Sequence, residues 1–179
     1  MADKTKKKPD CKGSVFANRM KELRSSCKIS QYGLSKIVGI SQPAICHYEH
    51  GSTFPTAKSL VKLSSTFECT IDYMIGLVEH PSITYGDAAL QFIDYAHFND
   101  CKFFFGKMLK AQRNAHGLSQ SKLAEQIGVK QSNVSAYEKG DAFPSMDNLY
   151  AICKILSISA DYLLGRAVIA DISEREIVP

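Results

Sequence analysis

The sequence lacks any apolar run of the roughly 18 residues that a helix needs to cross a bilayer, although 45% of its 179 residues are hydrophobic. No apolar segment follows the basic start of the chain, so no secretory signal is predicted. These absences favour a globular cytoplasmic protein without a membrane partner. The length allows one large domain or two small ones.

Paired cysteines and catalytic patterns are also missing. The six cysteines form no C-x-x-C pair, and such regularity would be needed for a disulfide framework or a zinc site. We therefore predict free thiols in a reducing compartment and no metal site. No Ser/His/Asp or Cys/His arrangement stands out, and no glycine-rich phosphate loop is present. Neither an enzyme nor a cofactor is expected.

What the chain does contain is an internal repeat. Sliding it by 89 residues aligns 16–76 with 105–165 without a gap, with 17 identities in 61 positions. Two copies indicate a duplication and not a solenoid, which needs at least three. In the first copy the identical positions are Phe16, Lys21, Arg24, Ser30, Gln31, Leu34, Gly39, Gln42, Tyr48, Glu49, Gly51, Phe54, Pro55, Leu60, Asp72, Tyr73 and Gly76.

The repeat sets the expected organisation of the chain. We predict a basic tail (1–15), a first domain (16–77), a connector (78–104), a second domain (105–166) and a C-terminal tail (167–179). Both domains carry a net charge of +3 and the connector −3, which is weak support for a nucleic-acid partner. Residues 87–98 are expected to form a helix for packing between domains or between chains, including a homodimer. The lysine-rich tail could wrap DNA or stay solvated.

Each copy divides into five short helical segments. In the second, we expect helices over 105–115, after Ser119, from Gln131 to about 138, after Ser145, and over 160–164. Serine is a good N-cap, and Gly128 suits the positive φ that ends a helix. Short helices are marginal alone and must pack around a small core. Segments two and three are separated by only a few residues, which predicts a helix-turn-helix.

Both copies resemble the Cro/repressor-type (XRE-like) helix-turn-helix domain. The shared pattern is S-Q-x-x-L-x-x-x-x-G-[IV]-x-Q-x-x-[IV]-x-x-Y-E-x-G-x-x-F-P. The resemblance covers about 122 of the 179 residues and implies an all-α fold of two five-helix, lambda-repressor-like domains. It further implies that the third helix of each domain lies in the DNA major groove.

The resemblance also assigns roles to glutamines at two helix starts. It implies that Gln31 and Gln120 grip a phosphate beside the groove, where free backbone N–H groups also suit an anion. From the residues alone, a solvated surface glutamine is the alternative. Gln42 and Gln131 open the third helices, and a glutamine there can make a bidentate pair with adenine.

The remaining outward positions of the third helix differ between the copies. In the second they are Ser132, Asn133, Ser135 and Ala136; their counterparts in the first are Pro43, Ala44, Cys46 and His47. The two domains should therefore not read the same bases, and the first could have lost base reading. The expected DNA contacts in these helices include Ala44, His47, Ser132, Asn133 and Ser135.

Two further features flank the third helix. Lys130 precedes it in the second copy, where the helix dipole disfavours a cation unless a phosphate lies nearby. Ser41, a better cap, takes this place in the first copy and is also a candidate DNA contact. The resemblance implies that an arginine of the first helix pairs with the glutamate that ends the third. These structural pairs are Arg24–Glu49 and Arg113–Glu138.

We therefore expect a sequence-specific double-stranded DNA-binding transcriptional regulator, and favour a repressor. The alternative is that the second repeat alone reads DNA, while the first repeat and the connector bind a partner or dimerise, as in an antitoxin or phage immunity regulator. The 13 residues after the second repeat are too few for a sensor domain, so no small-molecule ligand is expected.

Overall fold

A computed structural model describes residues 12–81 and 101–166. These residues form helices and no strands. The first repeat comprises α1 (Lys12–Ser26), α2 (Gln31–Val38), α3 (Gln42–Glu49), α4 (Ala57–Thr66) and α5 (Ile71–Met74). The second comprises α6 (Cys101–Ala115), α7 (Gln120–Ile127), α8 (Gln131–Lys139), α9 (Met146–Ile155) and α10 (Ala160–Leu163). The expected all-α fold is confirmed.

Serine caps and left-handed glycines set the length of the second helix in each repeat. Ser30 accepts the backbone N–H of Gly33, and Ser119 accepts that of Lys122. Each side chain thereby satisfies one of the free N–H groups at a helix start. The same helix in each repeat ends at a glycine with φ of +64° or +80°, where a residue with a Cβ is strained. These predictions from sequence are confirmed.

The predicted start of one helix was wrong, and another helix begins before the predicted domain boundary. Helix α6 begins at Cys101 and not at Phe105, and α1 begins at Lys12, within the stretch assigned to the tail. The reason is that the expected starts came from the limits of repeat similarity, which do not coincide with the ends of the helices. Ser41 occupies the N-cap of α3, but its side chain makes no capping hydrogen bond.

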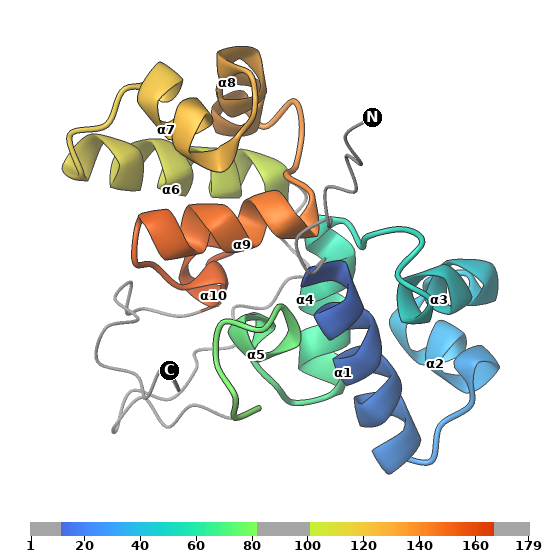
Figure 1. Cartoon of the computed structure of the whole chain (residues 1–179). Helices are drawn as coiled ribbons and strands as arrows, with labels where there is room; N and C mark the ends of the chain where they lie inside the picture. The colour runs from blue at the N-terminus through green and yellow to red at the C-terminus, as the bar shows by residue number, and fades with distance from the viewer. Residues whose placement is uncertain (1–11, 82–100, 167–179) are drawn as a thin grey trace, which may run out of the picture.

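The hydrophobic core runs without interruption from one repeat into the other. Within each repeat, the aromatic residue that opens the alignment, Phe16 or Phe105, is completely buried. Between repeats, α1 contacts α9, α4 contacts α6, and α5 contacts α10. Figure 1 shows α5 and α10 beside each other at the centre of the molecule. Each repeat therefore buries its short last helix against that of the other.

The inter-repeat contacts follow an approximate twofold symmetry. The alignment makes α1 the counterpart of α6, α4 of α9 and α5 of α10. Exchanging the repeats therefore converts the α1–α9 contact into the α6–α4 contact and maps the α5–α10 contact onto itself. In Figure 1 the units α2–α3 and α7–α8 lie at separate corners, away from this central contact. The expected helix over 87–98 lies outside the described residues.

Candidate nucleic-acid interface

The start of the third helix of each repeat is solvent-exposed. In α8, Gln131, Ser132 and Asn133 are exposed, while Ser135 is half-buried. In α3, Gln42 and His47 are exposed and Ala44 is half-buried. Buried Val134 and Tyr137 hold the opposite face of α8 against the core. The side chains predicted to reach DNA are therefore available on the surface.

A chain of hydrogen bonds holds the first glutamine of α8. The Nε2 atom of Gln131 donates to Oε1 of Gln120, 2.6 Å away. Gln120 in turn donates to Oε2 of Glu138 at 2.8 Å. Because Glu138 is also paired with Arg113, the chain extends from the protein interior to the exposed glutamine. It restrains an otherwise flexible side chain before any ligand arrives.

The first repeat contains the same chain of contacts. Gln42 donates to Gln31 at 3.2 Å, and Gln31 donates to Glu49 at 2.9 Å. The outer bond is longer than its counterpart in the second repeat, at the upper end of the usual range. The sequence predicted the glutamines as independent DNA contacts, and their mutual hydrogen bonds were missed. Their recurrence at matching positions was the available signal.

The predicted arginine–glutamate pairs are present in both repeats. Arg24 Nε and Arg113 Nε each lie 2.5 Å from Oε1 of their glutamate, and a second guanidinium nitrogen donates to Oε2. Each arginine also donates to a backbone carbonyl in the turn before the second helix, Ile29 or Leu118. The pairs therefore tie the first helix to both members of the helix-turn-helix.

Burial and hydrogen bonding shift the pKa of Glu49 in opposite directions. Burial raises its pKa, but hydrogen bonds from Arg24 and Gln31 outweigh this effect, so that the pKa is lowered from its usual 4.5. Glu49 therefore stays an acceptor at neutral pH. A charged carboxylate is the stronger hydrogen-bond acceptor for the amide of Gln31.

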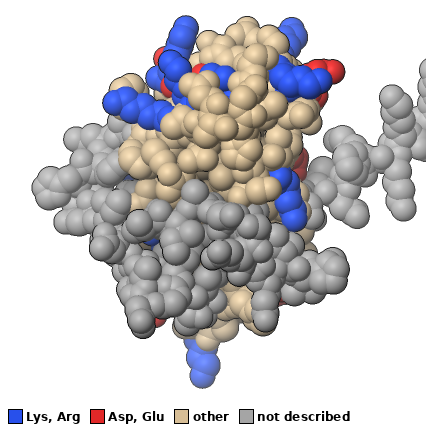
Figure 2. Space-filling view, turned by 90° about the vertical axis from the view of Figure 1, so that its left-hand side faces the viewer, with Lys and Arg blue, Asp and Glu red and all other residues tan. Residues whose placement is uncertain are grey.

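Basic side chains are prominent on the second repeat. Lys130 lies at the N-cap of α8, makes no capping bond and is exposed. The other exposed lysines of α6–α8 are Lys102, Lys107, Lys110, Lys122 and Lys139. Figure 2 shows Lys and Arg side chains spread around the top of the molecule, with some Asp and Glu side chains among them, at the level where Figure 1 places α6–α8. Such a surface suits a polyanion.

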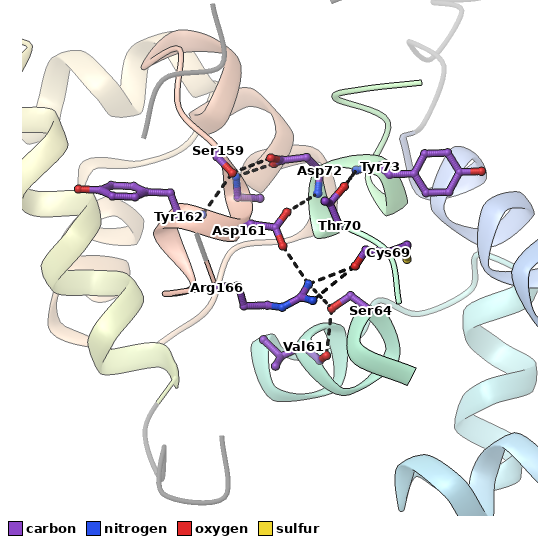
Figure 3. Close-up of polar contacts among 11 residues, drawn as sticks. Val61, Ser64, Cys69, Thr70, Asp72, Tyr73, Ser159, Asp161, Tyr162 and Arg166 are labelled. Carbon is purple, nitrogen blue, oxygen red and sulfur yellow. Dashed lines mark hydrogen bonds and ion pairs between the residues drawn. The ribbon is translucent and has the colours of Figure 1, made fainter. Parts of the chain in front are cut away.

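A buried polar cluster joins the two repeats away from the helix-turn-helix units (Figure 3). Asp72 and Asp161, which occupy matching positions, are both completely buried, and Arg166 is 2% exposed. Burial raises the pKa of Asp161 to about 6, helped by the negative charge of Asp72 and opposed by Arg166. The sequence showed the aspartates as an identity within an apolar stretch, but nothing local indicated that they would meet.

Four of the six cysteines are free thiols, as the sequence predicts. Cys27, Cys46, Cys69 and Cys153 form no disulfide. Burial raises the pKa of the Cys69 thiol to about 12, so this side chain stays protonated and unreactive. No group of three or more His, Cys, Asp or Glu residues capable of holding a metal occurs in the part of the chain that the structure describes. Within the same part, no helix is long and apolar enough to span a membrane.

The geometry of both sites is that of a helix-turn-helix protein, and comparison with known proteins agrees. A helix-turn-helix family model matches the chain twice, over residues 20–74 and 109–163. The chain belongs to this family, and the expectation of two Cro/repressor-type domains is confirmed.

Individual relatives carry the names of transcription regulators. The chain is 32% identical over 73 residues to the HTH-type transcriptional regulator ImmR of Bacillus subtilis, covering 41% of this chain and 58% of that protein. It is 40% identical over 58 residues to the cryptic phage CTXphi transcriptional repressor RstR of Vibrio cholerae, covering 32% and 52%. It is 33% identical over 72 residues to the HTH-type transcriptional activator BcrR of Enterococcus faecalis, covering 40% and 35%. The matches thus span between about a third and three-fifths of these relatives.

Proposed function

We propose that the chain is a sequence-specific double-stranded DNA-binding transcriptional regulator, with α3 and α8 each reading bases in the major groove. The observation that carries this proposal is the supported glutamine that opens each helix. Gln131 is exposed and held by Gln120, and Gln42 is exposed and held by Gln31. A glutamine so placed can form a bidentate pair with an adenine edge.

The phosphate contacts are assigned to the groups around these helix starts. Lys130 brings a positive charge to the N-terminus of α8, where the free N–H groups also favour an anion. Gln120 and Gln31 keep one amide N–H beyond the bond to their glutamate, and this N–H can donate to a phosphate oxygen. Ser41 contributes its hydroxyl in the first repeat, because that group makes no capping bond.

The two domains read unlike half-sites. Ser132, Asn133 and Ser135 of α8 offer donors and acceptors, whereas Ala44 of α3 offers only a methyl group. A methyl group suits the thymine C5-methyl, and His47 can hydrogen-bond a base edge. One chain therefore holds both readers that a single-domain regulator would obtain by forming a dimer. We assign repression because the match to RstR, which is named a transcriptional repressor, covers the helix-turn-helix; the match to BcrR, which is named an activator, makes activation the alternative.

A second candidate function is favoured by one difference between the repeats. Tyr32 is 63% exposed and Ile37 58% exposed on α2, where the second repeat has Ser121 and Gln126. Exposed apolar side chains of this kind mark binding surfaces. Under this alternative only α8 reads DNA, and the first repeat binds a protein partner.

Paired substitutions separate the two candidates. Gln42→Ala and Gln131→Ala are each titrated against a duplex selected by the full chain, with Gln126→Ala as a control for loss of an exposed glutamine. If α3 and α8 both read bases, Gln42→Ala and Gln131→Ala should each lose about 1–3 kcal/mol of binding free energy, and the affinity of the control should be unchanged. A loss confined to Gln131→Ala supports the alternative, and no loss in either variant contradicts both.

A further inference from the structure

At the start of the last helix of each repeat, a backbone N–H is bonded to an aspartate of the other repeat, while the cap of its own repeat, Thr70 or Ser159, accepts a further N–H. The Asp72 carboxylate accepts the backbone N–H of Ala160 at 2.6 Å and the hydroxyl of Ser159 at 2.6 Å. Reciprocally, Asp161 accepts the backbone N–H of Asp72 at 3.0 Å, and the N–H of Ile71 also lowers its pKa. Free N–H groups at a helix start need such acceptors when buried. Separating the repeats breaks these bonds on both sides.

Arg166 breaks the symmetry of this arrangement. Its guanidinium donates to Asp161 at 2.9 Å within its own repeat, and across the boundary to the hydroxyl of Ser64 at 2.6 Å and to the carbonyl of Cys69. Figure 3 shows the guanidinium between Asp161 and the α4–α5 turn of the first repeat. The interface is therefore charged and hydrogen-bonded on this side of the approximate axis.

On the opposite side of the axis, other residues take the places of Arg166 and Ser64. The counterpart of Arg166 is Leu77, and the counterpart of Ser64 is Cys153. Leu77 is 4% exposed and Cys153 completely buried. Both members of the polar pair thus differ together: a guanidinium meets a hydroxyl on one side, and Leu77 and Cys153 take these places on the other. The contact face of the first repeat therefore matches that of the second repeat better than it matches a copy of itself.

This complementarity disfavours pairing between identical repeats. Two first repeats would bring two Asp72 carboxylates together without any arginine at position 77. Two second repeats would place each Arg166 opposite Cys153 instead of Ser64. An uncompensated buried charge is strongly destabilising, so two buried aspartates without an arginine disfavour the pair of first repeats. A pair of second repeats would keep its Arg166–Asp161 ion pairs and lose the bond from Arg166 to the Ser64 hydroxyl. Specificity of this kind depends on penalties against the wrong partner as well as on favourable contacts.

We propose that Arg166 is a positioning residue that, with Asp72 and Asp161, locks the two unlike repeats together and so fixes the spacing and relative orientation of the two half-sites. This inference rests on the proposed function of α3 and α8. The locked pair holds α3 and α8 at one separation. After one of these helices has bound its half-site, the other can bind without rearrangement of the repeats only if the duplex carries the second half-site at that separation. Without Arg166 the two buried aspartates have no cation between them, and the apolar contacts between the repeats hold them with less restraint on their relative orientation. Binding to both half-sites then continues at many spacings.

The test compares the full chain with Arg166→Leu, which introduces the residue found at position 77. Lys154→Leu is the control, since it removes an exposed charge from the second repeat. Each protein is titrated against duplexes in which the two selected half-sites are moved apart in single base-pair steps over half a helical turn, about 5 base pairs. Single half-sites are titrated in parallel.

We expect the wild type and Lys154→Leu to lose about tenfold or more in affinity away from the preferred spacing. Arg166→Leu should vary by less than about threefold across the series, with single half-site affinity unchanged to within the same factor. Arg166→Gln, which keeps an amide donor for Ser64 but loses the charge, is measured alongside so that the test stands if the leucine variant does not fold. Wild-type spacing dependence in the folded arginine variants would overturn the inference.

A measurement without DNA separates this inference from the proposed function. Hydrogen exchange of the backbone N–H groups of Asp72 and Ala160 reports directly on the lock. Faster exchange at both groups in Arg166→Leu, with protection in α7 retained, supports the lock even if no duplex binds. Unchanged exchange contradicts it. Failure of the wild type to select any duplex counts against the proposed function alone.

Discussion

Gln131, the first residue of α8, donates from Nε2 to the Oε1 atom of Gln120, the first residue of α7, at 2.6 Å. This bond connects the start of the recognition helix to the start of the preceding helix. We expect the two glutamines to act as one unit in DNA binding. In a double-mutant cycle, Gln120→Ala and Gln131→Ala should show a coupling energy of about 0.5–3 kcal/mol in binding titrations.

The matched cycle in the first repeat provides a comparison. The Gln42–Gln31 bond is 3.2 Å long, so its coupling should be smaller than that of Gln131 and Gln120. Strictly additive effects in the second repeat would contradict a supporting role for Gln120.

The Arg113–Glu138 ion pair should be important for stability, because its side chains are only 9% and 3% exposed. Arg113→Met leaves a buried carboxylate without its cation and should lower the free energy of unfolding by about 3–5 kcal/mol. The double variant Arg113→Met/Glu138→Leu should recover much of this loss. Urea denaturation measures both.

An exposed ion pair serves as the control for this prediction. Lys122 and Glu125 are 56% and 70% exposed, so Lys122→Met should cost at most about 1 kcal/mol. Equal costs for the buried and the exposed pair would be inconsistent with the structure.

Gly106 allows α6 to approach the end of α8. A Cβ atom at this position would lie 2.5 Å from the carbonyl oxygen of Tyr137 and 2.7 Å from that of Glu138. Gly→Ala in a helix usually stabilises by about 1 kcal/mol, but here we expect a net loss of about 1–3 kcal/mol from overpacking. Displacement of α8 should also weaken DNA binding.

The first repeat already has alanine at the matching position, Ala17, which is buried. Ala17→Gly should be destabilising by about 0.5–1 kcal/mol. We therefore expect Gly106→Ala and Ala17→Gly both to lower the free energy of unfolding. Thermal unfolding of the two variants checks the signs, and stabilisation by Gly106→Ala would contradict the close approach.

Stability should depend on pH through Asp161. Burial and the charge of Asp72 raise its pKa from 3.8 to about 6 in the folded protein. The folded chain therefore keeps a proton that the unfolded chain releases between these values, and the free energy of unfolding falls as pH rises toward and through about 6. Glu49, whose pKa is lowered, acts in the opposite sense, losing its contribution only as pH falls below about 4.5.

The measurement is the urea midpoint of the wild type, Asp161→Asn and the exposed control Asp141→Asn between about pH 5 and pH 7. The wild type and Asp141→Asn should lose stability across this range, and Asp161→Asn should show a flatter profile. A profile for Asp161→Asn parallel to that of the wild type would exclude Asp161 as the titrating group.

Local chemistry made much of the fold predictable. Ser119 starts α7 through its capping side chain and Gly128 ends it through its left-handed backbone, so a short window of sequence is sufficient to predict both limits. The Arg113–Glu138 pair was expected only through family resemblance, because its members are 25 residues apart. The start of α6 at Cys101 was missed, because the expected start was taken from the position where similarity between the repeats begins.

The contact between repeats could not be predicted in the same way. Asp72 and Ala160 are separated by 88 positions, and their hydrogen bond depends on how two complete domains pack. Arg166 occupies a position at which the repeats differ, so the alignment gave no reason to single it out. The glutamine contacts were predictable only in part. Their recurrence in both repeats identified the residues, but it did not show that they are hydrogen-bonded to each other.

Selection of bound duplexes from a random pool by the intact chain tests the central claim most directly. The account predicts two dissimilar half-sites, in inverted relative orientation and at one preferred spacing, with the second half-site lost selectively in Gln131→Ala. A single half-site, a palindrome of identical half-sites, or no enrichment over the starting pool would contradict it.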